Sequence, residues 1–255
     1  IWKKVIHVDE NVIKMREFIY SLIDVKPQMS ILDIGCGSGY DLGRISERVD
    51  RNSSLYGLDL SEKSILAAKK EYNSDPRFRF LYGDTSNAID FDNDTFDVVF
   101  SSNMLECITD KHFLIKEVHR VLKPGGQVVF AHYDWDSQLF DGDDKELVRK
   151  IVRTYNDWKQ GWMTDLDAWM GRRLWRAFQK SGLFQNGRIE TYVLTNTKFE
   201  EPFFGYMRVQ DFGSMVKRNM ISEKEYSLFF DDVKKLAAQE QYFYSINMYV
   251  YVGIK

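Results

Sequence analysis

Apolar residues along the first half of the chain recur at two alternating spacings. Residues 12–25 place them three and four positions apart, which predicts an amphipathic helix. Residues 30–34 are then a short, mostly apolar run that ends directly on glycines, which predicts a strand followed by a turn. The pattern repeats, and we predict helices near 41–49, 62–72 and 110–122 and strands at 55–59, 78–82, 96–100 and 127–132.

The second half of the chain is less regular. We predict helices at about 143–160 and 167–181, a strand near 188–196, further helices around 205–238 and a last strand at 242–252. Strands that alternate with helices are typical of a doubly wound, parallel α/β sheet. No linker rich in Gly, Ser or Pro interrupts the sequence, so we predict one domain over 1–255, with cap helices inserted in the stretch at about 134–240.

The composition bounds the protein classes to which this chain can belong. A chain of 255 residues, 44% of them apolar, can bury one sizeable core. Its 35 Lys and Arg against 38 Asp and Glu give a net charge of -3, so we predict no nucleic-acid partner. Only 4 Pro and 16 Gly, together with 15% aromatic residues, exclude collagen-like and disordered chains.

The cysteines and the hydropathy pattern indicate where the protein resides. Cys36 and Cys107 are too few for a disulfide framework, and neither has the Cys or His neighbours of a zinc site. We therefore predict a reducing compartment and no metal centre. No apolar run approaches the ~18 residues of a membrane span, and the first residues do not form a signal peptide. The sequence predicts a cytoplasmic protein without a membrane partner.

A glycine-rich turn follows the first predicted strand, in the run Asp33-Ile34-Gly35-Cys36-Gly37-Ser38-Gly39. Glycine permits unusual backbone angles and lets a ligand lie against the chain, and open α/β sheets bind ligands at the carboxyl ends of their strands. A tight turn without a ligand is the alternative. The dinucleotide pattern G-x-G-x-x-G would need a glycine at Tyr40, which argues against a nicotinamide oxidoreductase.

Two aspartates follow the next two predicted strands. Asp59 comes twenty positions after Gly39, where a carboxylate can accept hydrogen bonds from both hydroxyls of a ribose. Asp84 follows the next strand, where it can accept from the exocyclic amine of an adenine. Each aspartate alone could be a helix cap or a turn residue. Together, at successive strand ends, they favour one nucleoside pocket.

These motifs resemble those of class I S-adenosylmethionine-dependent methyltransferases. The run 33–39 is similar to the family's first motif, and runs 96–103 and 120–126 are similar to its fourth strand and to the turn before its fifth. The resemblance covers about 28–133 as a donor-binding core. It implies a Rossmann-like sheet of seven strands with an antiparallel last strand, and S-adenosylmethionine as cofactor with S-adenosylhomocysteine as product. The predicted cofactor-binding residues are Asp33, Gly35, Cys36, Gly37, Gly39, Tyr40, Asp59, Leu60, Gly83, Asp84, Thr85, Ser101 and Asn103.

Residues 131–137 and 167–183 resemble the ubiquinone/menaquinone-biosynthesis-like subgroup of this family, whose members act on small molecules. The run 101–104 is Ser-Ser-Asn-Met. It departs from the Asn/Asp-Pro-Pro-aromatic run of similar enzymes that methylate planar amines of nucleobases or glutamine. A free small-molecule acceptor is therefore favoured.

The methyl-transfer chemistry needs orientation more than acid–base groups, because a sulfonium methyl donor is reactive in itself. An acceptor hydroxyl or ammonium must also lose a proton, which a positioned His or Asp can take. His132 and Asp134 lie just past the predicted fifth strand and are the candidates. The alternative for His132 is a polar residue that closes the strand. In-line displacement by an N- or O-nucleophile is the predicted reaction.

Five of the six tryptophans follow the predicted fifth strand, with aspartates interleaved among them. Trp158 and Trp162 are four residues apart, which on a helix places them on one face. An aromatic wall with acids would suit a cationic amine, and a hydrophobic cap packed on the sheet is the alternative. Arg172 would bind a carboxylate or phosphate of the acceptor, or pair with the acids. The predicted substrate-binding residues are Trp135, Trp158, Trp162 and Arg172.

A second class of function uses the same pocket. A regulatory or scaffold protein would bind S-adenosylmethionine without turnover, and its cap would serve a partner. The sequence predicts neither the identity of the acceptor nor the oligomeric state.

Overall fold

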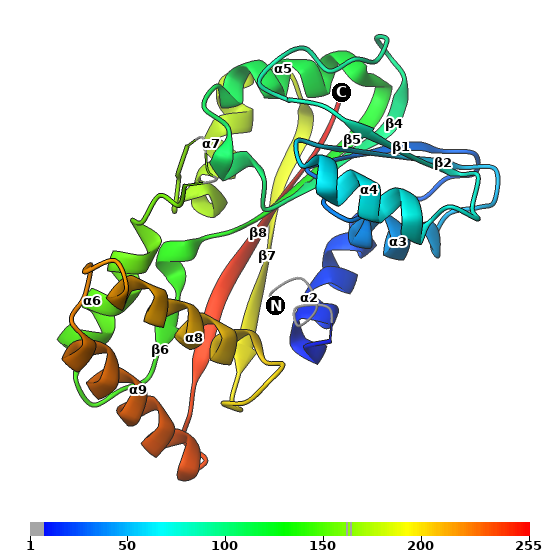
Figure 1. Cartoon of the computed structure of the whole chain (residues 1–255). Helices are drawn as coiled ribbons and strands as arrows, with labels where there is room; N and C mark the ends of the chain where they lie inside the picture. The colour runs from blue at the N-terminus through cyan, green and yellow to red at the C-terminus, as the bar shows by residue number, and fades with distance from the viewer. Residues whose placement is uncertain (1–7, 162, 164) are drawn as a thin grey trace. The chain divides into compact units, whose positions relative to one another are not determined.

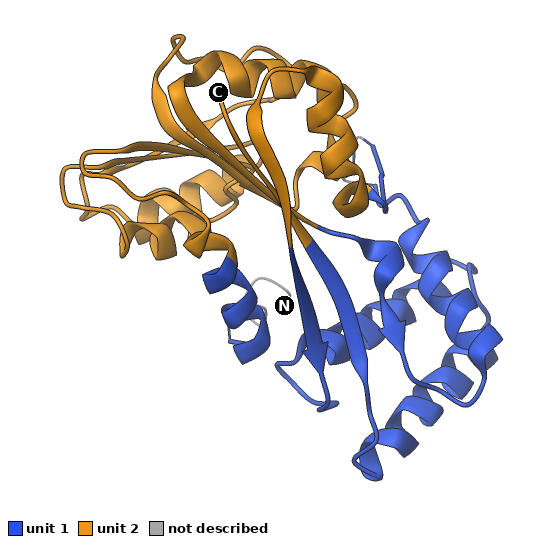
Figure 2. Ribbon diagram, turned by 180° about the vertical axis from the view of Figure 1, so that it is seen from behind, with its two compact units in different colours: residues 1–18, 133–169, 191–248 blue, residues 19–132, 170–190, 249–255 orange. Residues whose placement is uncertain are grey.

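The computed structural model describes residues 8–161, 163 and 165–255. Within these residues the chain divides into two compact units (Figure 2). Unit 1 comprises the described residues of 1–18, 133–169 and 191–248. Unit 2 comprises residues 19–132, 170–190 and 249–255, so it contains residues 28–132 of the predicted donor-binding core.

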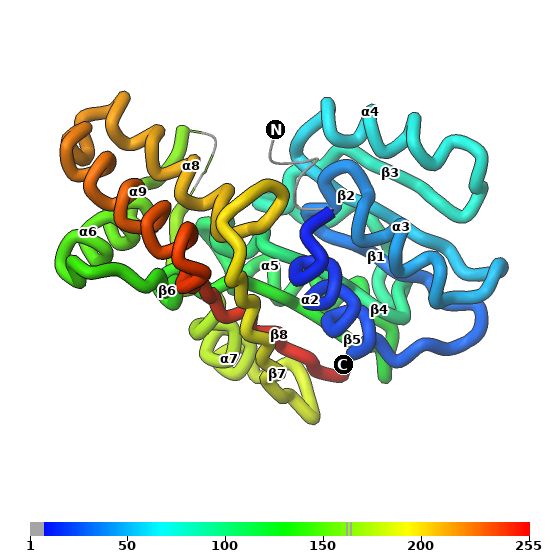
Figure 3. The backbone as a smooth tube through the Cα atoms, turned by 90° about the horizontal axis from the view of Figure 1, so that it is seen from below, coloured from blue at the N-terminus to red at the C-terminus, as the bar shows by residue number. Residues whose placement is uncertain are grey.

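The first half of the chain forms a parallel sheet. Its strands are β1 (Ser30–Ile34), β2 (Ser54–Asp59), β3 (Phe78–Tyr82), β4 (Phe96–Ser102) and β5 (Leu122–Tyr133) (Figure 1). Helix α3 (Tyr40–Ser46) joins β1 to β2, α4 (Glu62–Glu71) joins β2 to β3, and α5 (Lys111–Val121) precedes β5, as the tube in Figure 3 shows. Parallel pairing of β3 with β2, β2 with β1, β1 with β4 and β4 with β5 confirms the predicted doubly wound sheet.

The complete sheet has the order β3-β2-β1-β4-β5-β8-β6, and β7 pairs with β8 outside this path. Strand β7 spans Gln185–Asn196, and β8 spans Tyr244–Ile254. The last strand, β8, is antiparallel to β6 (Leu139–Phe140). Seven strands along this path with an antiparallel last strand confirm the predicted Rossmann-like fold. Strand β6 was not predicted, because a two-residue strand is too short to show a period in the sequence.

The core of unit 2 explains why its strands read as nearly continuous apolar runs. Parallel strands that are covered on both faces bury successive residues, and β1 and β4 follow that pattern. Helix α7 (Met170–Ser181) packs beside α5, and the Phe178 ring stacks on Tyr251 with centroids 4.1 Å apart. The fully buried aliphatic and aromatic residues of this cluster include Leu32, Ile34, Phe96, Val99, Leu114, Val118, Val128 and Leu174. This core fixes the strand ends that carry the candidate site.

Unit 1 contains α6 (Lys145–Asn156), α8 (Phe204–Val216), α9 (Glu223–Ala238) and most of α2 (Glu10–Ser21). Its core is aromatic, because the Phe140 ring lies 4.7 Å from Tyr244, 5.7 Å from Phe212 and 5.6 Å from Phe229. Among the described residues of the chain, no helix is both long and apolar enough to cross a membrane.

The predicted helix at 143–160 is shorter in the structure. Helix α6 ends at Asn156, and Trp158 follows it in an irregular segment, so the prediction that Trp158 and Trp162 share a helix face was wrong for Trp158. Asn156 and Asp157 have low helix propensity, and the Asn156 side chain bonds outside the helix, to Trp135 O and Gln138. Trp162 lies outside the described residues.

Candidate functional site

The glycine-rich turn lies at the carboxyl end of β1 and is hydrogen-bonded to β2. The backbone N–H groups of Gly35 and Cys36 both donate to Leu58 O, at 2.8 and 3.1 Å. Gly35, Gly37 and Gly39 have φ angles of +79°, +56° and +81°, in the left-handed region that strains any residue with a Cβ. The backbone of the turn therefore needs glycine at these three positions.

The three glycines differ in what surrounds them. A Cβ on Gly35 would lie 2.7 Å from Met104 Cγ, and one on Gly39 would lie 2.8 Å from Phe80 Cζ. At Gly37, apart from its chain neighbours, no described atom comes within 4 Å of that position. At Gly35 and Gly39 the protein's own side chains occupy the space that a Cβ would need, and contact of these two glycines with a donor stays a prediction. Gly37 is the position that leaves an open cradle.

Asp59 holds the turn in place. Its Oδ2 accepts a hydrogen bond from Gly37 N at 2.7 Å, and its Oδ1 accepts one from Ser61 N at 2.7 Å. The structure thus brings together Asp59 and the open glycine, which lie 22 residues apart. Each carboxylate oxygen has two lone pairs, so both oxygens can still accept a hydrogen bond from a hydroxyl group. Leu60, which follows Asp59, is 56% exposed at the same strand end.

Asp84 lies two residues past the end of β3, and Gly83 N donates to Asp59 O at 3.1 Å between the two strand ends. Hydrogen bonds from the Ser86 hydroxyl and from Ser86 N, the latter at 2.9 Å, lower the pKa of the Asp84 carboxyl. Asp84 is therefore an exposed anion at neutral pH, with Thr85 beside it.

Two side chains beside the turn, Cys36 and Tyr20, are buried. Burial, with the charges of Asp33 and Asp59, raises the pKa of the Cys36 thiol, so this cysteine stays neutral. The Tyr20 hydroxyl donates to Asp41 Oδ1, in the first turn of α3, which begins at Tyr40. Tyr20 is 1% exposed and was not identified from the sequence, where it is one of two aromatic residues in an amphipathic helix.

The end of β4 is tied to both neighbouring strands. The Ser101 hydroxyl donates to Ile34 O at 2.8 Å in a buried position, which binds β4 to β1. Asn103 N donates to Ala131 O at 2.9 Å, which binds the residue after β4 to β5. Asn103 has a φ of +55°, which asparagine tolerates better than most residues. Ser101 and Asn103 thus shape the strand ends beside the glycine turn.

His132 is buried near the end of β5, and a buried carboxylate faces it. Its Nε2 lies 3.9 Å from Oε2 of Glu106, in the short 3-10 turn η1 (Leu105–Cys107), and the two side chains are 1% and 4% exposed. Glu106 was not identified from the sequence, since an acid in a short turn after a strand has no distinctive spacing. The second predicted catalytic residue, Asp134, is fully buried in unit 1, where its backbone N–H donates to Asn247 O at 3.0 Å.

Trp135 begins the 3-10 turn η2 (Trp135–Ser137) of unit 1 and is fixed by a buried polar network. Its carbonyl oxygen accepts hydrogen bonds from Asn156 Nδ2 at 2.6 Å and from Gln138 Nε2 at 3.2 Å. The Tyr244 hydroxyl donates to Gln138 Oε1 at 3.1 Å, which links the network to β8. A network with this many partners orders the backbone of Trp135.

The tryptophan rings of unit 1 contact arginines of the chain itself. The guanidinium carbon of Arg208 lies 5.2 Å from the Trp135 ring centroid and 4.5 Å from that of Tyr155, and Arg218 lies 4.9 Å from that of Trp158. Burial opposes the charge of Arg208, but Tyr155 and Asp211 outweigh it and raise the pKa of the guanidinium. These contacts favour packing over a cage for a cationic amine. Arg172 lies on the exposed side of α7 in unit 2.

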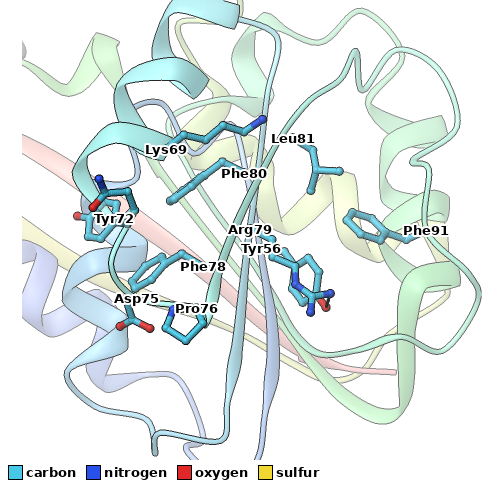
Figure 4. Close-up of a pocket in the computed structure, with 11 residues that line it drawn as sticks. Tyr56, Lys69, Tyr72, Asp75, Pro76, Phe78, Arg79, Phe80, Leu81 and Phe91 are labelled. Atoms are coloured by element: carbon cyan, nitrogen blue, oxygen red, sulfur yellow. Dashed lines mark hydrogen bonds between the residues drawn. The ribbon is translucent and has the colours of Figure 1, made fainter.

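A cavity of about 530 Å³ lies along β3 in unit 2 (Figure 4), and two of its lining residues, Tyr72 and Phe80, also border Gly39 of the glycine turn. Phe78 and Phe80 line it from one face of the strand, and Arg79 lines it from the other, where its Nη1 donates to the Tyr56 hydroxyl at 3.2 Å. None of the predicted site residues lines this cavity. The candidate site is therefore the glycine turn and the strand ends beside it.

Comparisons with known proteins agree with this fold. A model of the methyltransferase domain family matches residues 25–197. The demethylmenaquinone methyltransferase of Staphylococcus epidermidis is 34% identical over 114 residues, which cover 45% of this chain and 47% of that protein. The chain spans about half or less of the length of the curated relatives it matches.

Two solved structures share the fold over nearly the whole chain. A methyltransferase structure from Bacillus halodurans has a TM-score of 0.63 at 14% identity and covers 95% of this chain and 99% of that one. Phosphoethanolamine N-methyltransferase 2 of Haemonchus contortus, solved in complex with S-adenosylmethionine, has a TM-score of 0.57 at 19% identity and covers 95% of this chain and 52% of that one. The family model matches about two thirds of the chain, and the sheet order agrees with the fold of the solved neighbours: the chain belongs to the methyltransferase domain family.

Proposed function

We propose that this chain transfers the methyl group of S-adenosylmethionine to an N- or O-nucleophile of a small-molecule acceptor and releases S-adenosylhomocysteine. The observation that carries the proposal is the hydrogen bond from Gly37 N to Asp59, which joins the open cradle at Gly37 to the carboxylate at the end of β2. Membership of the methyltransferase family supports it, as does the relative that acts on demethylmenaquinone. The neighbour solved with S-adenosylmethionine supports the choice of donor.

The residues present fit an adenosyl sulfonium donor. The cradle at Gly37 lets a ligand approach the backbone, and the Asp59 carboxylate has lone pairs left for the ribose hydroxyls. The anionic Asp84 suits the exocyclic amine of the adenine. Tyr40 and Asp41, at the start of α3, are proposed to lie beside the methionine portion. Of the other predicted cofactor residues, Leu60, Gly83 and Thr85 adjoin the two aspartates in the sequence, and Asp33, Cys36, Ser101 and Asn103 are proposed to act through the shape of the strand ends.

The donor supplies an activated methyl group, so the protein's task is to orient the acceptor and to exclude water. Good orientation of two reactants lowers a barrier by up to ~7–11 kcal/mol. His132 is proposed to take the proton that an acceptor hydroxyl or ammonium loses, and Asp134 is the second candidate.

Acceptor binding is assigned to Trp135, Trp158, Trp162 and Arg172. Because Trp135 and Trp158 contact arginines of the chain, we infer that they contribute apolar walls and not a cage for a cation. Arg172 contributes positive charge toward an acidic group of the acceptor.

Calorimetry tests the proposal. We expect the wild-type chain to bind S-adenosylhomocysteine and Asp59→Ala to bind it at least tenfold more weakly, because both the ribose acceptor and the tie to Gly37 are lost. Glu62→Ala, an exposed acid on α4 in the same unit, is the control and keeps wild-type affinity. Equal affinity of Asp59→Ala and the wild type would overturn the assignment.

Turnover separates the enzyme from a binding protein. Release of S-adenosylhomocysteine during incubation with S-adenosylmethionine and a pool of metabolites is the expected result. Tight binding without turnover over a broad set of amines, phenols and carboxylates would instead support a regulatory or scaffold protein.

A further inference from the structure

The sheet of unit 2 is open at the outer edge of β3. This strand is terminal in the sheet order, and among the described residues it pairs only with β2. Gly83 N donates to Asp59 O, and in a parallel pair every second residue makes such bonds. The backbone groups of Phe80 and Tyr82 therefore point away from β2. An edge of this kind can accept a further strand.

A cavity of about 530 Å³ follows this edge, and Figure 4 shows its side chains on both sides of the strand. On one side the Phe78 ring stacks on Tyr72 with centroids 4.4 Å apart, and Phe80 lies 5.9 Å from Phe78. On the other side the Tyr56 ring lies 5.6 Å from that of Phe91. Both walls are aromatic, so an occupant of the cavity covers apolar surface on either side of the strand.

The cavity also carries positive charge. Lys69 and Arg79 line it, both are exposed, and neither forms an ion pair with a described residue. The lining acid, Asp75, is already paired with Arg77, whose Nη2 lies 2.8 Å from Asp75 Oδ2. The two cations therefore favour an occupant with negative charge.

A charged side chain on an edge strand often keeps other chains away. Arg79 is placed differently, because its guanidinium carbon lies 5.5 Å from the centroid of the Tyr56 ring and its Nη1 donates to the Tyr56 hydroxyl. The side chain is thus held against one face of the sheet, and its other N–H groups can still donate. Leu81 and Tyr82, which are 38% and 61% exposed, extend the apolar surface along the strand.

We propose that the outer edge of β3 is a docking site for an extended segment of a partner protein in which apolar and acidic residues alternate. Successive residues of an added strand point to opposite faces of the sheet. The apolar residues of the segment pack on Phe78 and Tyr72, and its acidic residues accept hydrogen bonds from Arg79 on the other face. A second copy of this chain fits less well, because its own β3, Phe-Arg-Phe-Leu-Tyr, brings no acid.

The aromatic wall connects this docking site to the glycine turn. A Cβ on Gly39 would lie 2.8 Å from Phe80 Cζ and 3.0 Å from Tyr72 Cε2, and a Cβ on Gly43 of α3 would meet the Tyr72 hydroxyl. The rings that an added strand covers therefore pack against the backbone that is proposed to hold the donor. Docking at β3 is expected to change the affinity for the donor, a consequence that rests on the proposed function, whereas docking itself does not.

Nuclear magnetic resonance of the full chain with capped hexapeptides tests the docking site. We expect a peptide of alternating valine and glutamate to shift the backbone amide signals of 78–82 in a saturable way, and one of alternating valine and lysine to leave them unchanged. Arg79→Glu is expected to bind the glutamate peptide about fivefold more weakly, the upper end for an exposed ion pair. Arg51→Glu makes the same change of charge at an exposed residue of unit 2 and keeps the wild-type affinity.

Three results would overturn the docking site. The first is a wild-type chain that does not respond to the glutamate peptide or responds equally to both peptides. The second is an unchanged affinity in Arg79→Glu. The third is a dimer of the chain alone, seen by sedimentation, that the glutamate peptide dissociates, because a second copy would then occupy the edge.

N-methylation of the glutamate peptide separates an added strand from a ligand that is held by its side chains alone. Methyl groups on alternate amides remove the donors from one edge of the peptide. Of the two alternately methylated peptides, we expect one to lose binding and the other to keep it, because an added strand presents only one edge to β3. Equal affinities of the two would mean that no strand is added and that the proposal is wrong.

Calorimetry with S-adenosylhomocysteine tests the connection to the glycine turn. With the glutamate peptide at saturation, we expect the affinity for S-adenosylhomocysteine to change at least about twofold, and the peptide affinity to change by the same factor when S-adenosylhomocysteine is saturating. An unchanged affinity would refute the connection. Because the peptide titration needs no donor, the docking site and the proposed function fail in distinguishable experiments.

Discussion

At the scale of single residues, glycine serves two different purposes in the turn after β1. Gly35 and Gly39 allow Met104 and Phe80 to pack against the backbone, whereas Gly37 faces open space. All three have a positive φ, so alanine at any of them strains the backbone by about 1–2 kcal/mol. The added methyl group has a steric consequence only where a neighbour is already close.

A pair of alanine substitutions separates these purposes. We expect Gly35→Ala to lower the free energy of unfolding more than Gly37→Ala, because only the first adds a clash, at 2.7 Å from Met104 Cγ. Gly37→Ala is expected to weaken S-adenosylhomocysteine binding while the fold is largely retained. Thermal denaturation and calorimetry on the two variants measure this, and equal losses in both would contradict it.

Single residues are also where prediction from the sequence was weakest. Asp59 was identifiable because it follows a strand at a set distance from a glycine motif. Glu106 and Arg208 were not, since one faces a histidine from a short turn and the other contacts aromatic rings from a helix. Both owe their positions to contacts between segments that are far apart in the chain, for which a single sequence carries no spacing signal.

At the scale of elements, α5 anchors the segment before β4. Arg120 donates to Ile89 O and Phe91 O, both at 2.7 Å, and to both oxygens of Glu117, while Glu117 Oε2 accepts from Ile89 N at 2.8 Å. Arg120 belongs to the run 120–126 on which the family resemblance partly rests. In the structure, Arg120 connects helix α5 to the segment before β4 through these hydrogen bonds.

Arg120→Ala is expected to destabilise the protein by about 2–3 kcal/mol, because two partly buried backbone carbonyl groups lose their donors. The hydrogen bond from Arg120 lowers the pKa of Glu117 below its ordinary value of 4.5. The pair therefore contributes fully to the free energy of unfolding above pH 4.5, and this contribution is lost as the pH falls through the lower pKa of the folded state. Denaturant unfolding of the wild type and the variant from pH 7 to pH 3 measures the effect. The difference in the free energy of unfolding between the wild type and Arg120→Ala is expected to become smaller below about pH 4.5. A difference that stays constant over this range would refute the coupling.

Elements with a clear period were predicted well and irregular ones were not. Strands β1 and β3 have the predicted bounds, because each is a short apolar run limited by turn residues. The end of α6 was misplaced because the Asn156 side chain bonds to Trp135 O, on a turn twenty-one residues earlier. Tertiary hydrogen bonds of this kind override helical periodicity.

At the scale of the whole molecule, the predicted donor residues all belong to one unit. The glycine turn, Asp59, Asp84 and the end of β4 lie within 19–132, whereas Trp135 and Trp158 belong to unit 1. The proposed donor site therefore uses residues of unit 2 alone, and the binding of the acceptor by Trp135 and Trp158 of unit 1 stays a prediction. The sequence pattern of the donor region is the clearer one because the donor is shared by a whole family while acceptors vary.

Hydrogen exchange can test this division. Added S-adenosylhomocysteine is expected to slow exchange most at the backbone amides of 35–39 and around Asp84, because ligand binding suppresses local opening where it makes contacts. The amides of α8 and α9 are expected to change little. Mass spectrometry of peptides from the free and the bound chain measures both, and protection confined to α8 and α9 would contradict the placement of the donor site.

The Asp59 carboxylate accepts from two backbone N–H groups at once. An asparagine here would turn an NH₂ group toward one of these donors, and a glutamate would push the carboxylate into the turn. A change of this side chain therefore also changes the loop after β1. The proposed contact with the ribose and the shape of the glycine turn depend on the same carboxylate.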